Sequence, residues 1–356
     1  MTTTPSPEVL VTALDDIDAD VVARAANVLR SGGLVAIPTE TVYGLGCNAL
    51  DPVAVARVFE AKGRPATDPL IVHVDGLDMA ASVVDGPLPP AAATLAAAFW
   101  PGPLTMVLPR AAIVPTTVTS GLESVGVRCP SHPVAAAIIS AAGLPVAAPS
   151  ANPFGRISPT TAQHVVDDLG SAVDVVVDAG PSERGLESTV VAFDGDEVVV
   201  LRHGAVTAEE LASHVVVRTV AADDDATMAS PGHDERHYAP RTPAIAVATG
   251  VVSGESGPPS LAVVYAGYDD HRPALPEGWH FHSLGSRAAL DDVARELYGG
   301  LRRIDALPAS LILLELTGGT GIGRAIDDRL TRAASSIVVT TPAELTAAMQ
   351  RLGPPA

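Results

Sequence analysis

The sequence predicts an α/β protein with two domains, the first of them built on a mixed sheet. Its 356 residues are enough for two domains. Short apolar runs typical of strands occur between segments of helical periodicity, but without a regular βαβ rhythm, which favours a mixed sheet over a parallel one. Segment 221–240 carries three consecutive aspartates and few core-forming residues, so it predicts a linker between the domains.

The first part of the chain opens with an expected loose lead-in over residues 1–17. Asp51 and Pro52 form an N-cap and first-turn pair, which predicts a helix that ends on Lys62. The Pro38–Gly46 segment before it, written PTETVYGLG, is expected to be a loop. The flanking elements predicted from periodicity are a helix over 18–30, a strand over 34–37, a turn over 62–65 and a strand ending at His73.

The remainder of the first domain continues as a mixture of helices and strands. Helices are predicted over 89–99, 133–142 and 159–169. Strands are predicted over 104–108, 124–128, 146–148, 173–177, 188–193 and 198–202. The 146–148 strand leads into 149–153, where prolines bracket small polar residues and predict a rigid loop with donors aimed at one point.

The second domain is predicted to be smaller. Its strands are expected over 261–265 and 311–316. Its helices are expected over 290–304 and 343–352, and a further helix is expected to follow the glycine-rich turn 317–323. We therefore expect a first domain over 18–215, a linker or lid over 216–243, and a second domain over 244–352.

Composition limits the classes of function. Hydrophobic residues make up 47% and charged residues 18% of the chain, which is typical of a globular protein. The net charge of −19 argues against tight nucleic-acid binding, which needs a basic footprint, but leaves room for a local basic pocket. Two cysteines provide neither a disulfide framework nor a zinc set, so reduced thiols and a cytoplasmic location are expected.

Targeting and membrane segments are not expected either. Residues 1–20 lack the basic and apolar regions of a signal peptide. The longest apolar stretch, 134–148, is interrupted by Gly143 and Pro145, and it predicts a buried helix and strand rather than a membrane span.

Lys62 is the only lysine among the 22 basic residues of the chain. A single lysine in an arginine-rich chain suggests a task for a compact ammonium, aimed at a phosphate or carboxylate. The alternative is a chance surface lysine at a helix C-terminus, where a cation is mildly favourable.

Polar residues gather at the ends of the predicted strands and turns of the first domain. Three arginines and one lysine from separate strand ends, in so acidic a protein, predict a pocket for a polyanion such as a nucleoside triphosphate. The hydroxyl groups among them could position a second, small substrate. The residues are Thr41, Lys62, Arg64, His73, Arg128, Ser150, Asn152, Ser188 and Arg202.

Three other motifs are interpreted as structural. The 233–237 segment has zincin-like histidine spacing, but its Glu is one position late and it lies in the linker. The 319–323 segment misses the dinucleotide spacing by one residue, which favours a plain strand-to-helix turn, although an anion at that helix N-terminus stays open. His280 and His282 alternate on one strand and are expected to be exposed.

The chain as a whole resembles the threonylcarbamoyl-adenylate synthases, in particular their long two-domain form. The resemblance covers 18–215 and 230–240 strongly and 245–350 more loosely. It implies a YrdC-like mixed-sheet catalytic domain and a smaller C-terminal Rossmann-like α/β domain. The segments that carry it are Pro38–Gly46, Lys62–Pro65, His73, 100–105 (WPGPLT), 127–130 (VRCP), 149–152 (PSAN), 187–190 (ESTV), 230–232 (SPG) and 237–240 (HYAP).

The resemblance implies a reaction in which L-threonine, bicarbonate and ATP, carried with Mg²⁺, give threonylcarbamoyl-AMP and pyrophosphate. The product would feed the threonylcarbamoyladenosine modification beside the tRNA anticodon, with downstream transfer proteins as partners. The resemblance implies no protein-bound structural metal. Tyr238 in the linker is expected to lie over the pocket as a lid that protects the labile product from hydrolysis.

Site residues carry over from the family motifs position by position. The implied catalytic residues are Lys62, Arg64, Ser150 and Asn152. The implied threonine-binding residues are Thr41, His73, Arg128, Ala148 (through its backbone) and Ser188. The implied ATP-binding residues are Arg64, Asp68, Ser124, Ser150, Ser158, Arg202 and Tyr238.

The chain departs from the family pattern at Asp68, where the family has asparagine, so a carboxylate would face the nucleotide. Two alternative functions are weighed against the synthase. An RNA-binding module with a concave YrdC-like face is disfavoured by the net charge of −19. Carbamoyl transfer in hydrogenase maturation is disfavoured because the chain lacks zinc-finger cysteine pairs and an acylphosphatase-like segment.

Overall fold

The computed structural model describes residues 6–219, 237–254 and 262–352. The chain divides into two compact units. The first contains Met1–Phe154 and Ser158–His233, and the second contains Gly155–Ile157 and Asp234–Ala356. The aspartate run 223–225 and segment 230–236 lie outside the described residues, so the expected domain and linker boundaries stay predictions.

The first unit is built on a mixed sheet, as the sequence predicts. In its described residues the sheet has eleven strands in the order β1-β8-β2-β3-β7-β4-β6-β5-β9-β10-β11. Parallel pairs such as β4 with β6 occur beside antiparallel pairs such as β5 with β6. The strands are β1 (Glu8–Val11), β2 (Val35–Ile37), β3 (Gly44–Asn48), β4 (Ile71–His73), β5 (Leu104–Pro109), β6 (Ser124–Arg128), β7 (Val146–Ala147), β8 (Val175–Asp178), β9 (Thr189–Asp194), β10 (Glu197–Arg202) and β11 (Val216–Thr219).

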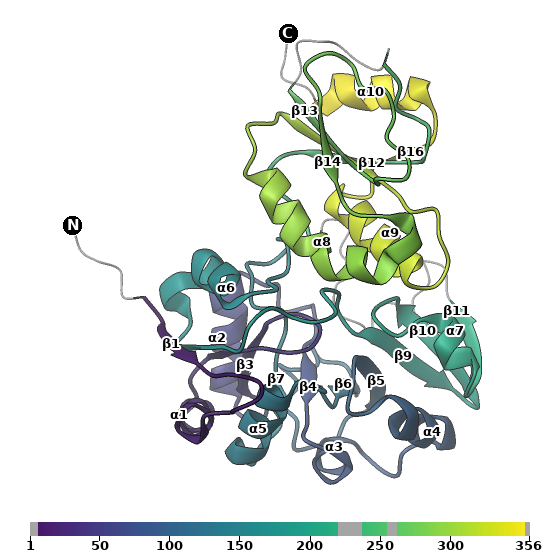
Figure 1. Ribbon diagram of the computed structural model, residues 1–356. Helices are drawn as coiled ribbons and strands as arrows, with labels where there is room; N and C mark the ends of the chain where they lie inside the picture. Colours follow the sequence, from purple (N-terminus) through teal and green to yellow (C-terminus); the bar gives the residue numbers. More distant parts are fainter. Residues whose placement is uncertain (1–5, 220–236, 255–261, 353–356) are drawn as a thin grey trace. The chain divides into compact units, whose positions relative to one another are not determined.

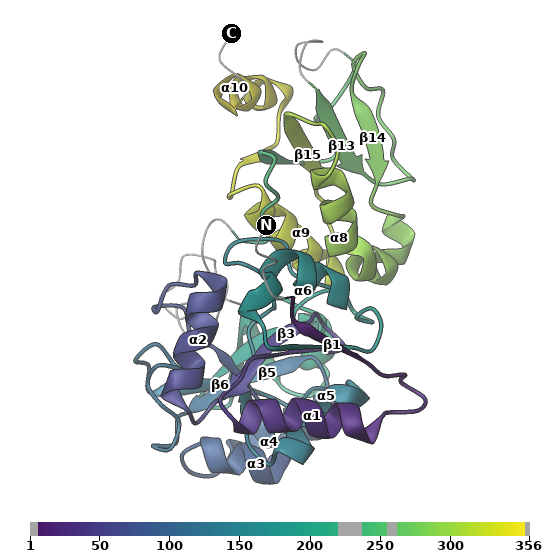
Figure 2. The same ribbon diagram turned by 90° about the vertical axis from the view of Figure 1, so that its left-hand side faces the viewer.

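Helices cover both faces of this sheet (Figures 1 and 2). Val35 and Ile37 of β2 pack with helices α1 and α5, whereas Ala36 between them joins a second core with α2, α4 and α6. This alternation follows from the two-residue period of a strand that is buried on both faces. The helices of the unit are α1 (Ala19–Arg30), α2 (Pro52–Lys62), α3 (Leu77–Val83), α4 (Pro90–Phe99), α5 (Pro133–Ala142), α6 (Ala162–Leu169) and α7 (Ala208–Ala212), with a 3₁₀ turn at Gly170–Ala172.

Some local expectations were wrong. The lead-in over 1–17 contains β1, which is held by parallel pairing with β8. The end of the expected 38–46 loop is the start of β3, which pairs with β2 and β7. Part of the expected linker is β11, which is paired with β10. For β1 and β3 the missing information was a partner strand far away in sequence, β8 and β7 respectively.

The second unit has a parallel sheet with the strand order β14-β13-β15-β12-β16 in its described residues. Tyr265, Leu313 and Trp279 contribute to its buried core. Its strands are β12 (Ala244–Val247), β13 (Val263–Gly267), β14 (His280–Ser283), β15 (Leu311–Glu315) and β16 (Val338–Val339). Its helices are α8 (Leu290–Asp305), α9 (Ile322–Ala333) and α10 (Pro342–Leu352), with a 3₁₀ turn at Arg287–Ala289. The fold class predicted for both units is confirmed.

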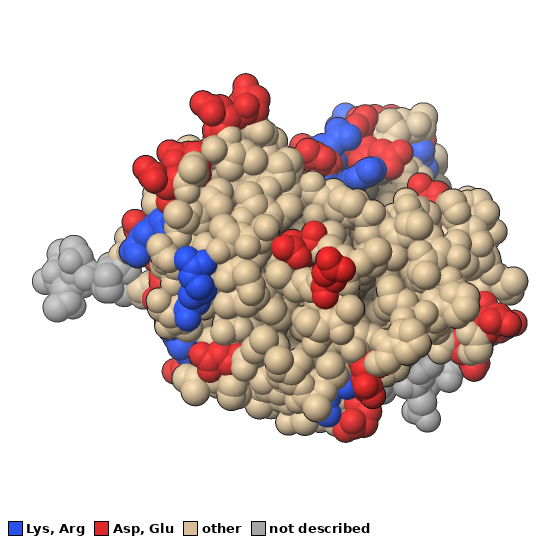
Figure 3. Space-filling view, turned by 90° about the horizontal axis from the view of Figure 1, so that it is seen from below, with Lys and Arg blue, Asp and Glu red and all other residues tan. Residues whose placement is uncertain are grey.

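The surface view in Figure 3 shows mostly uncharged atoms, with basic side chains in small separate groups on this face. Among the described residues, every helix is too short or too polar to span a bilayer. The alanine-rich stretch 134–148 instead forms α5 and β7, two buried elements of the first unit, as predicted.

Candidate active site

Lys62 ends helix α2, whose boundaries follow from its sequence. Asp51 caps the first turn by accepting a hydrogen bond from the amide of Val53, and Gly63 ends the helix in the left-handed conformation (φ 60°). The side chain of Lys62 is only 3% exposed. Its Nζ donates hydrogen bonds to the main-chain oxygens of Ser150, at 2.6 Å, and Asn152, at 2.5 Å. The alternative of a chance surface lysine is therefore wrong.

The electrostatic environment of Lys62 is unusual for a lysine. Burial, and then the neighbouring guanidinium of Arg64, lower the pKa of Lys62 well below its ordinary value. Asp68 acts in the opposite direction on the same ammonium. Two neutral carbonyl oxygens orient the amino group, and an anion bound beside it would favour its charged form.

Arg64 lies two residues after Lys62 and is also buried. Its guanidinium donates to the main-chain oxygens of Asp68 (3.1 Å) and Pro69 (2.9 Å) and makes an ion pair with the Asp68 carboxylate at 2.8 Å. The ring of Phe154 lies 5.9 Å from the guanidinium carbon. Asp68, which was expected to face the nucleotide, is thus bound to a predicted catalytic arginine of the same chain.

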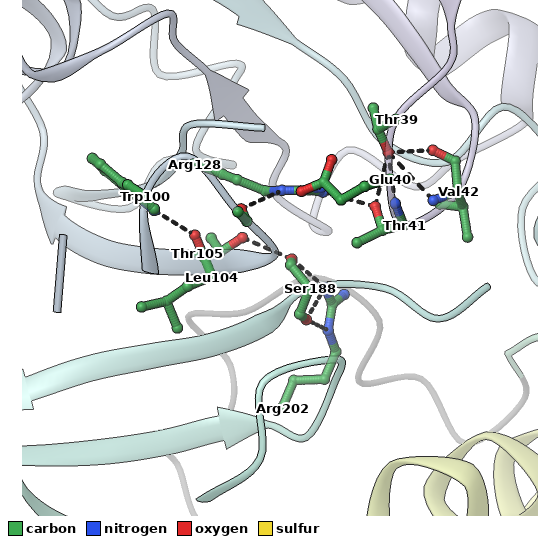
Figure 4. Close-up of polar contacts among 11 residues, drawn as sticks. Thr39, Glu40, Thr41, Val42, Trp100, Leu104, Thr105, Arg128, Ser188 and Arg202 are labelled. Atoms are coloured by element: carbon green, nitrogen blue, oxygen red, sulfur yellow. Dashed lines mark hydrogen bonds and ion pairs between the residues drawn. The ribbon is translucent and has the colours of Figure 1, made fainter. Parts of the chain in front are cut away.

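Arg128 ends β6 and organises a second group of residues (Figure 4). One terminal nitrogen lies 2.7 Å from the Glu40 carboxylate, and the other donates to the hydroxyl of Thr41 at 2.9 Å. Nε points to the Gly102 oxygen at the longer distance of 3.4 Å. Arg128 and Glu40 are 4% and 2% exposed, so the ion pair is inside the protein.

His73 ends β4 and is paired in register with Arg128 on the parallel strand β6. Burial and the positive charge of Arg128 lower the pKa of His73 to about 3. The imidazole is therefore neutral at physiological pH, which makes it a hydrogen-bonding group for a substrate rather than a third cation.

Ser188 and Arg202 form a third group. Thr105, which is paired in register with Arg128, shares a hydrogen bond with the Ser188 hydroxyl at 2.8 Å (Figure 4). The guanidinium of Arg202 donates to both the main-chain oxygen (3.0 Å) and the hydroxyl (3.2 Å) of Ser188.

Backbone contacts connect these groups. The amide of Ala151 donates to the Tyr43 oxygen at 2.8 Å, and Ser150 is bridged to Gly44, so the 150–152 loop lies beside the segment of Thr41. Ala148 donates its amide to the main-chain oxygen of Ile71 on β4, and its expected backbone contact with threonine stays a prediction. Lys62, the 150–152 loop, Thr41, Arg128, Thr105, Ser188 and Arg202 therefore form a continuous series of contacts.

Two predicted nucleotide residues lie at the margins of this series. Ser158 is fully buried and donates to the Glu187 carboxylate at 2.7 Å, directly before Ser188 in the chain. Ser124 begins β6, at the opposite end of that strand from Arg128. The strands β4 and β6 are parallel, so Ser124 at the start of β6 lies near the start of β4. The Asp68–Pro69 segment comes shortly before β4 in the chain.

Tyr238 belongs to the second unit and is described within it. Its ring is 1% exposed, stacks on Tyr298 at 5.6 Å and lies 5.1 Å from the guanidinium carbon of Arg329. Its φ of 58° is in the left-handed region, which is strained for a tyrosine. Its expected contact with the nucleotide and its role as a lid stay predictions.

Sequence reasoning missed Glu40 and Thr105 as members of the site. Glu40 lies inside the conspicuous PTETVYGLG segment, but nothing local shows that its carboxylate meets an arginine 88 residues later. No group of three or more His, Cys, Asp or Glu residues suited to a metal ion occurs in the described residues.

A mixed-sheet unit with these buried cations, followed by a smaller parallel-sheet unit, defines a class of two-domain YrdC-like α/β proteins. Residues 27–204 match the Sua5_yciO_yrdC family, described as "Telomere recombination". Residues 206–335 match the family described as "Threonylcarbamoyl-AMP synthase, C-terminal domain". The chain belongs to the threonylcarbamoyl-AMP synthase family.

Individual relatives agree over most of their length. The threonylcarbamoyl-AMP synthase of Bacillus subtilis is 39% identical over 89% of this chain and 94% of its own. That of Pyrococcus abyssi is 36% identical over 93% of this chain and 99% of its own. The crystal structure of P. abyssi Sua5 complexed with L-threonine aligns with a TM-score of 0.82 at 34% identity, covering 94% of this chain and 99% of that one.

Proposed function

We propose that this chain joins L-threonine, bicarbonate and ATP to form threonylcarbamoyl-AMP and pyrophosphate. The observation that carries the proposal is the continuous series of buried contacts from Lys62 through Arg128 to Arg202. These residues supply separate cations and hydroxyls for an amino acid and for a triphosphate, and the family to which the chain belongs is named for this product.

The group around Arg128 is the proposed amino-acid site. A guanidinium forks onto a carboxylate, so Arg128 receives the carboxylate of threonine. Thr41, neutral His73 and Ser188 provide hydrogen-bonding partners for its polar groups, and the backbone of Ala148 completes the site. The amine, once neutral, attacks bicarbonate: a C–N bond forms and water leaves, giving a carbamate.

The group around Lys62 and Arg64 is the proposed nucleotide site. A carbamate oxygen attacks the α-phosphorus of ATP, the new P–O bond forms and the bond to pyrophosphate breaks. The protein contributes positioning and charge neutralisation at the phosphates, which are the main terms in transfers of this kind. Ser150 and Asn152 hold Lys62 in place, while Asp68, Ser124, Ser158, Arg202 and Tyr238 are the further proposed nucleotide contacts.

Mg²⁺ enters this proposal as part of the substrate, bound to the phosphates of ATP. The acidic side chains at the site are already engaged, Asp68 with Arg64 and Glu40 with Arg128. The metal is therefore assigned to the triphosphate and not to a resident site of the protein. We further propose that the product serves tRNA threonylcarbamoyladenosine modification in the cytoplasm, through separate transfer proteins.

The test is a pyrophosphate-release assay with ATP, in which threonine and bicarbonate are each omitted in turn. The expected result is release that requires both, together with threonylcarbamoyl-AMP detected by mass spectrometry in a rapidly quenched reaction. Release that needs neither compound, or no release, would overturn the proposal. Tight, salt-sensitive tRNA binding without ATP turnover would instead favour an RNA-binding module.

A further inference from the structure

Glu40 has no role in the function proposed so far, yet it is among the most buried charged residues of the first unit, at 2% exposure. Its carboxylate lies 2.7 Å from Arg128. We propose that Glu40 is a positioning residue that holds the Arg128 guanidinium, and through it the Thr41 hydroxyl, in the arrangement that recognises the amino-acid substrate. This inference rests on the proposed function and names a further residue of that site.

The burial of this ion pair is weak evidence for a role in stability. Removing two charges from water costs several kcal/mol for each ion, and their mutual attraction in the interior only roughly repays it. Apolar side chains of similar volume would hold the end of β6 in place as well, because its backbone is already paired with β4 and β5. A function for the Arg128 guanidinium accounts for the pair better than packing does.

The contacts of Arg128 fix the plane of its guanidinium. Glu40 and Thr41 each engage a different terminal nitrogen, at 2.7 Å and 2.9 Å, and Nε is directed at Gly102. A guanidinium has five N–H bonds, more than these contacts use. In the proposed site, the carboxylate of the substrate accepts from those that remain.

The Thr39 hydroxyl determines the direction of the hydrogen bonds at Thr41. The Thr39 hydroxyl donates to the Val42 oxygen at 2.6 Å, so in its 2.8 Å contact with Thr41 it acts as the acceptor. The Thr41 hydroxyl therefore donates to Thr39 and accepts from Arg128. Towards a ligand it offers only a lone pair, which selects a donor such as the hydroxyl or amine of an amino acid.

The charges of Glu40 and Arg128 also fit an amino-acid site. Burial alone would raise the pKa of Glu40, but Arg128 and the main-chain amides of Glu40 and Ser131 hold that pKa below its ordinary value. Glu40 is thus an anion beside a cation, with neutral His73 next to them. Such a pair matches a zwitterionic amino acid: Arg128 takes the carboxylate, while Glu40 keeps the local charge balanced and the guanidinium in place.

The experiment compares Glu40→Gln, which removes the charge, with Glu40→Asp, which keeps it on a shorter side chain. Glu123→Gln is the matched control, because Glu123 pairs with Arg110 of the same unit but its side chain is 87% exposed. Pyrophosphate release is measured with threonine varied at saturating ATP and bicarbonate, and then with ATP varied at saturating threonine. Circular dichroism and thermal unfolding monitor the fold.

We expect Glu40→Gln to raise KM for threonine by about tenfold or more, with less than a twofold change in KM for ATP. Glu40→Asp should cause a smaller rise, and Glu123→Gln none. The proposal is overturned if Glu40→Gln raises both KM values equally, if it lowers only kcat, or if Glu40→Asp is as impaired as Glu40→Gln. If Glu40→Gln does not fold, Glu40→Asp is the test. A rise in KM for threonine without a rise in KM for ATP supports the proposal, and the absence of such a rise refutes it.

A failure of the proposed function can be told apart from a failure of this inference. If the wild-type chain releases no pyrophosphate, the proposed function fails, and threonine binding is then measured by calorimetry without ATP. A Kd about tenfold weaker in Glu40→Gln than in wild type and Glu123→Gln supports the role of Glu40. Equal Kd values, or no threonine binding by the wild type, refute it.

Discussion

The ammonium of Lys62 lies 2.6 Å from the main-chain oxygen of Ser150, with almost no exposure to solvent. This partner distinguishes Lys62 from Arg64 and Arg128, each of which is paired with a buried carboxylate. Carbonyl oxygens direct the amino group but carry no net charge, so a substrate anion bound beside Lys62 would favour its charged form. Lys62 is therefore the cation from which we expect the largest effect on catalysis.

Replacing Lys62 by Ala should lower kcat by about a hundredfold or more, because a positioned charge at the phosphates is lost. Lys62→Arg should cost far less, since it keeps the charge, and Lys62→Met, which keeps most of the volume, should resemble Ala. Steady-state pyrophosphate release measures all three. Equal losses for Ala and Arg would refute the argument from charge.

Asp68→Asn should lower KM for ATP by roughly three- to tenfold, which corresponds to the loss of a water-screened repulsion of about 1 kcal/mol. The carboxylate of Asp68 occupies Arg64 at 2.8 Å and adds a negative charge where phosphates are expected. The measurement is KM for ATP at saturating threonine. Asp194→Asn is the control, because Asp194 makes an exposed pair with Arg218. A higher KM for ATP would mean that Asp68 assists nucleotide binding.

His73 should make the stability of the first unit depend on pH. Its pKa is about 3 in the folded protein and about 6.5 when unfolded, so between these values only the unfolded state takes up the proton. Stability should therefore fall as the pH is lowered from 6.5 towards 3, by about 1.4 kcal/mol for each pH unit well inside that window. In His73→Gln this contribution should disappear.

Urea unfolding at several pH values tests the role of His73. The chain has two tryptophans, so fluorescence in a Trp279→Phe background follows Trp100 of the first unit. His214→Gln serves as the control, because His214 is exposed. An unchanged pH dependence in His73→Gln would show that His73 is not neutral in the folded state.

Tyr238→Ala should destabilise the second unit by about 3–5 kcal/mol, since it removes a buried ring packed against Tyr298 and Arg329. Tyr238→Phe should keep most of that stability, because the stacking surface remains. Urea unfolding followed through Trp279 in a Trp100→Phe background gives both values. If Tyr238→Ala leaves stability unchanged but raises KM for ATP, the ring acts at the nucleotide and not in this core.

Much of the site could be predicted because its residues follow strong local signals. The Asp51-Pro52 cap and Gly63 fixed the ends of α2 and hence the place of Lys62. The 124–128 strand was predicted with its observed bounds, which placed Arg128 at a strand end. Motif resemblance then joined segments that propensity alone could not connect, and the family membership that it implied is confirmed.

Local sequence could not predict the partners of the cations. Glu40 precedes β3 and meets Arg128 at the end of β6 because β3, β7, β4 and β6 are paired in that order in the sheet. The strands β1 and β3 were missed for the same reason, since edge strands and glycine-containing strands depend on distant partners.

By itself, the sequence determined the α/β class, most of the helices, and a set of cations and hydroxyls in an otherwise acidic chain. Helix caps and periodicity depend on residues that are close together in the chain, and composition depends on no structure at all. These features can therefore be recognised from the sequence. The tertiary structure alone decided that Lys62 is held by neutral carbonyls while Arg64 and Arg128 are held by carboxylates. Such pairings depend on distances between residues far apart in the chain, which only the packed sheet sets.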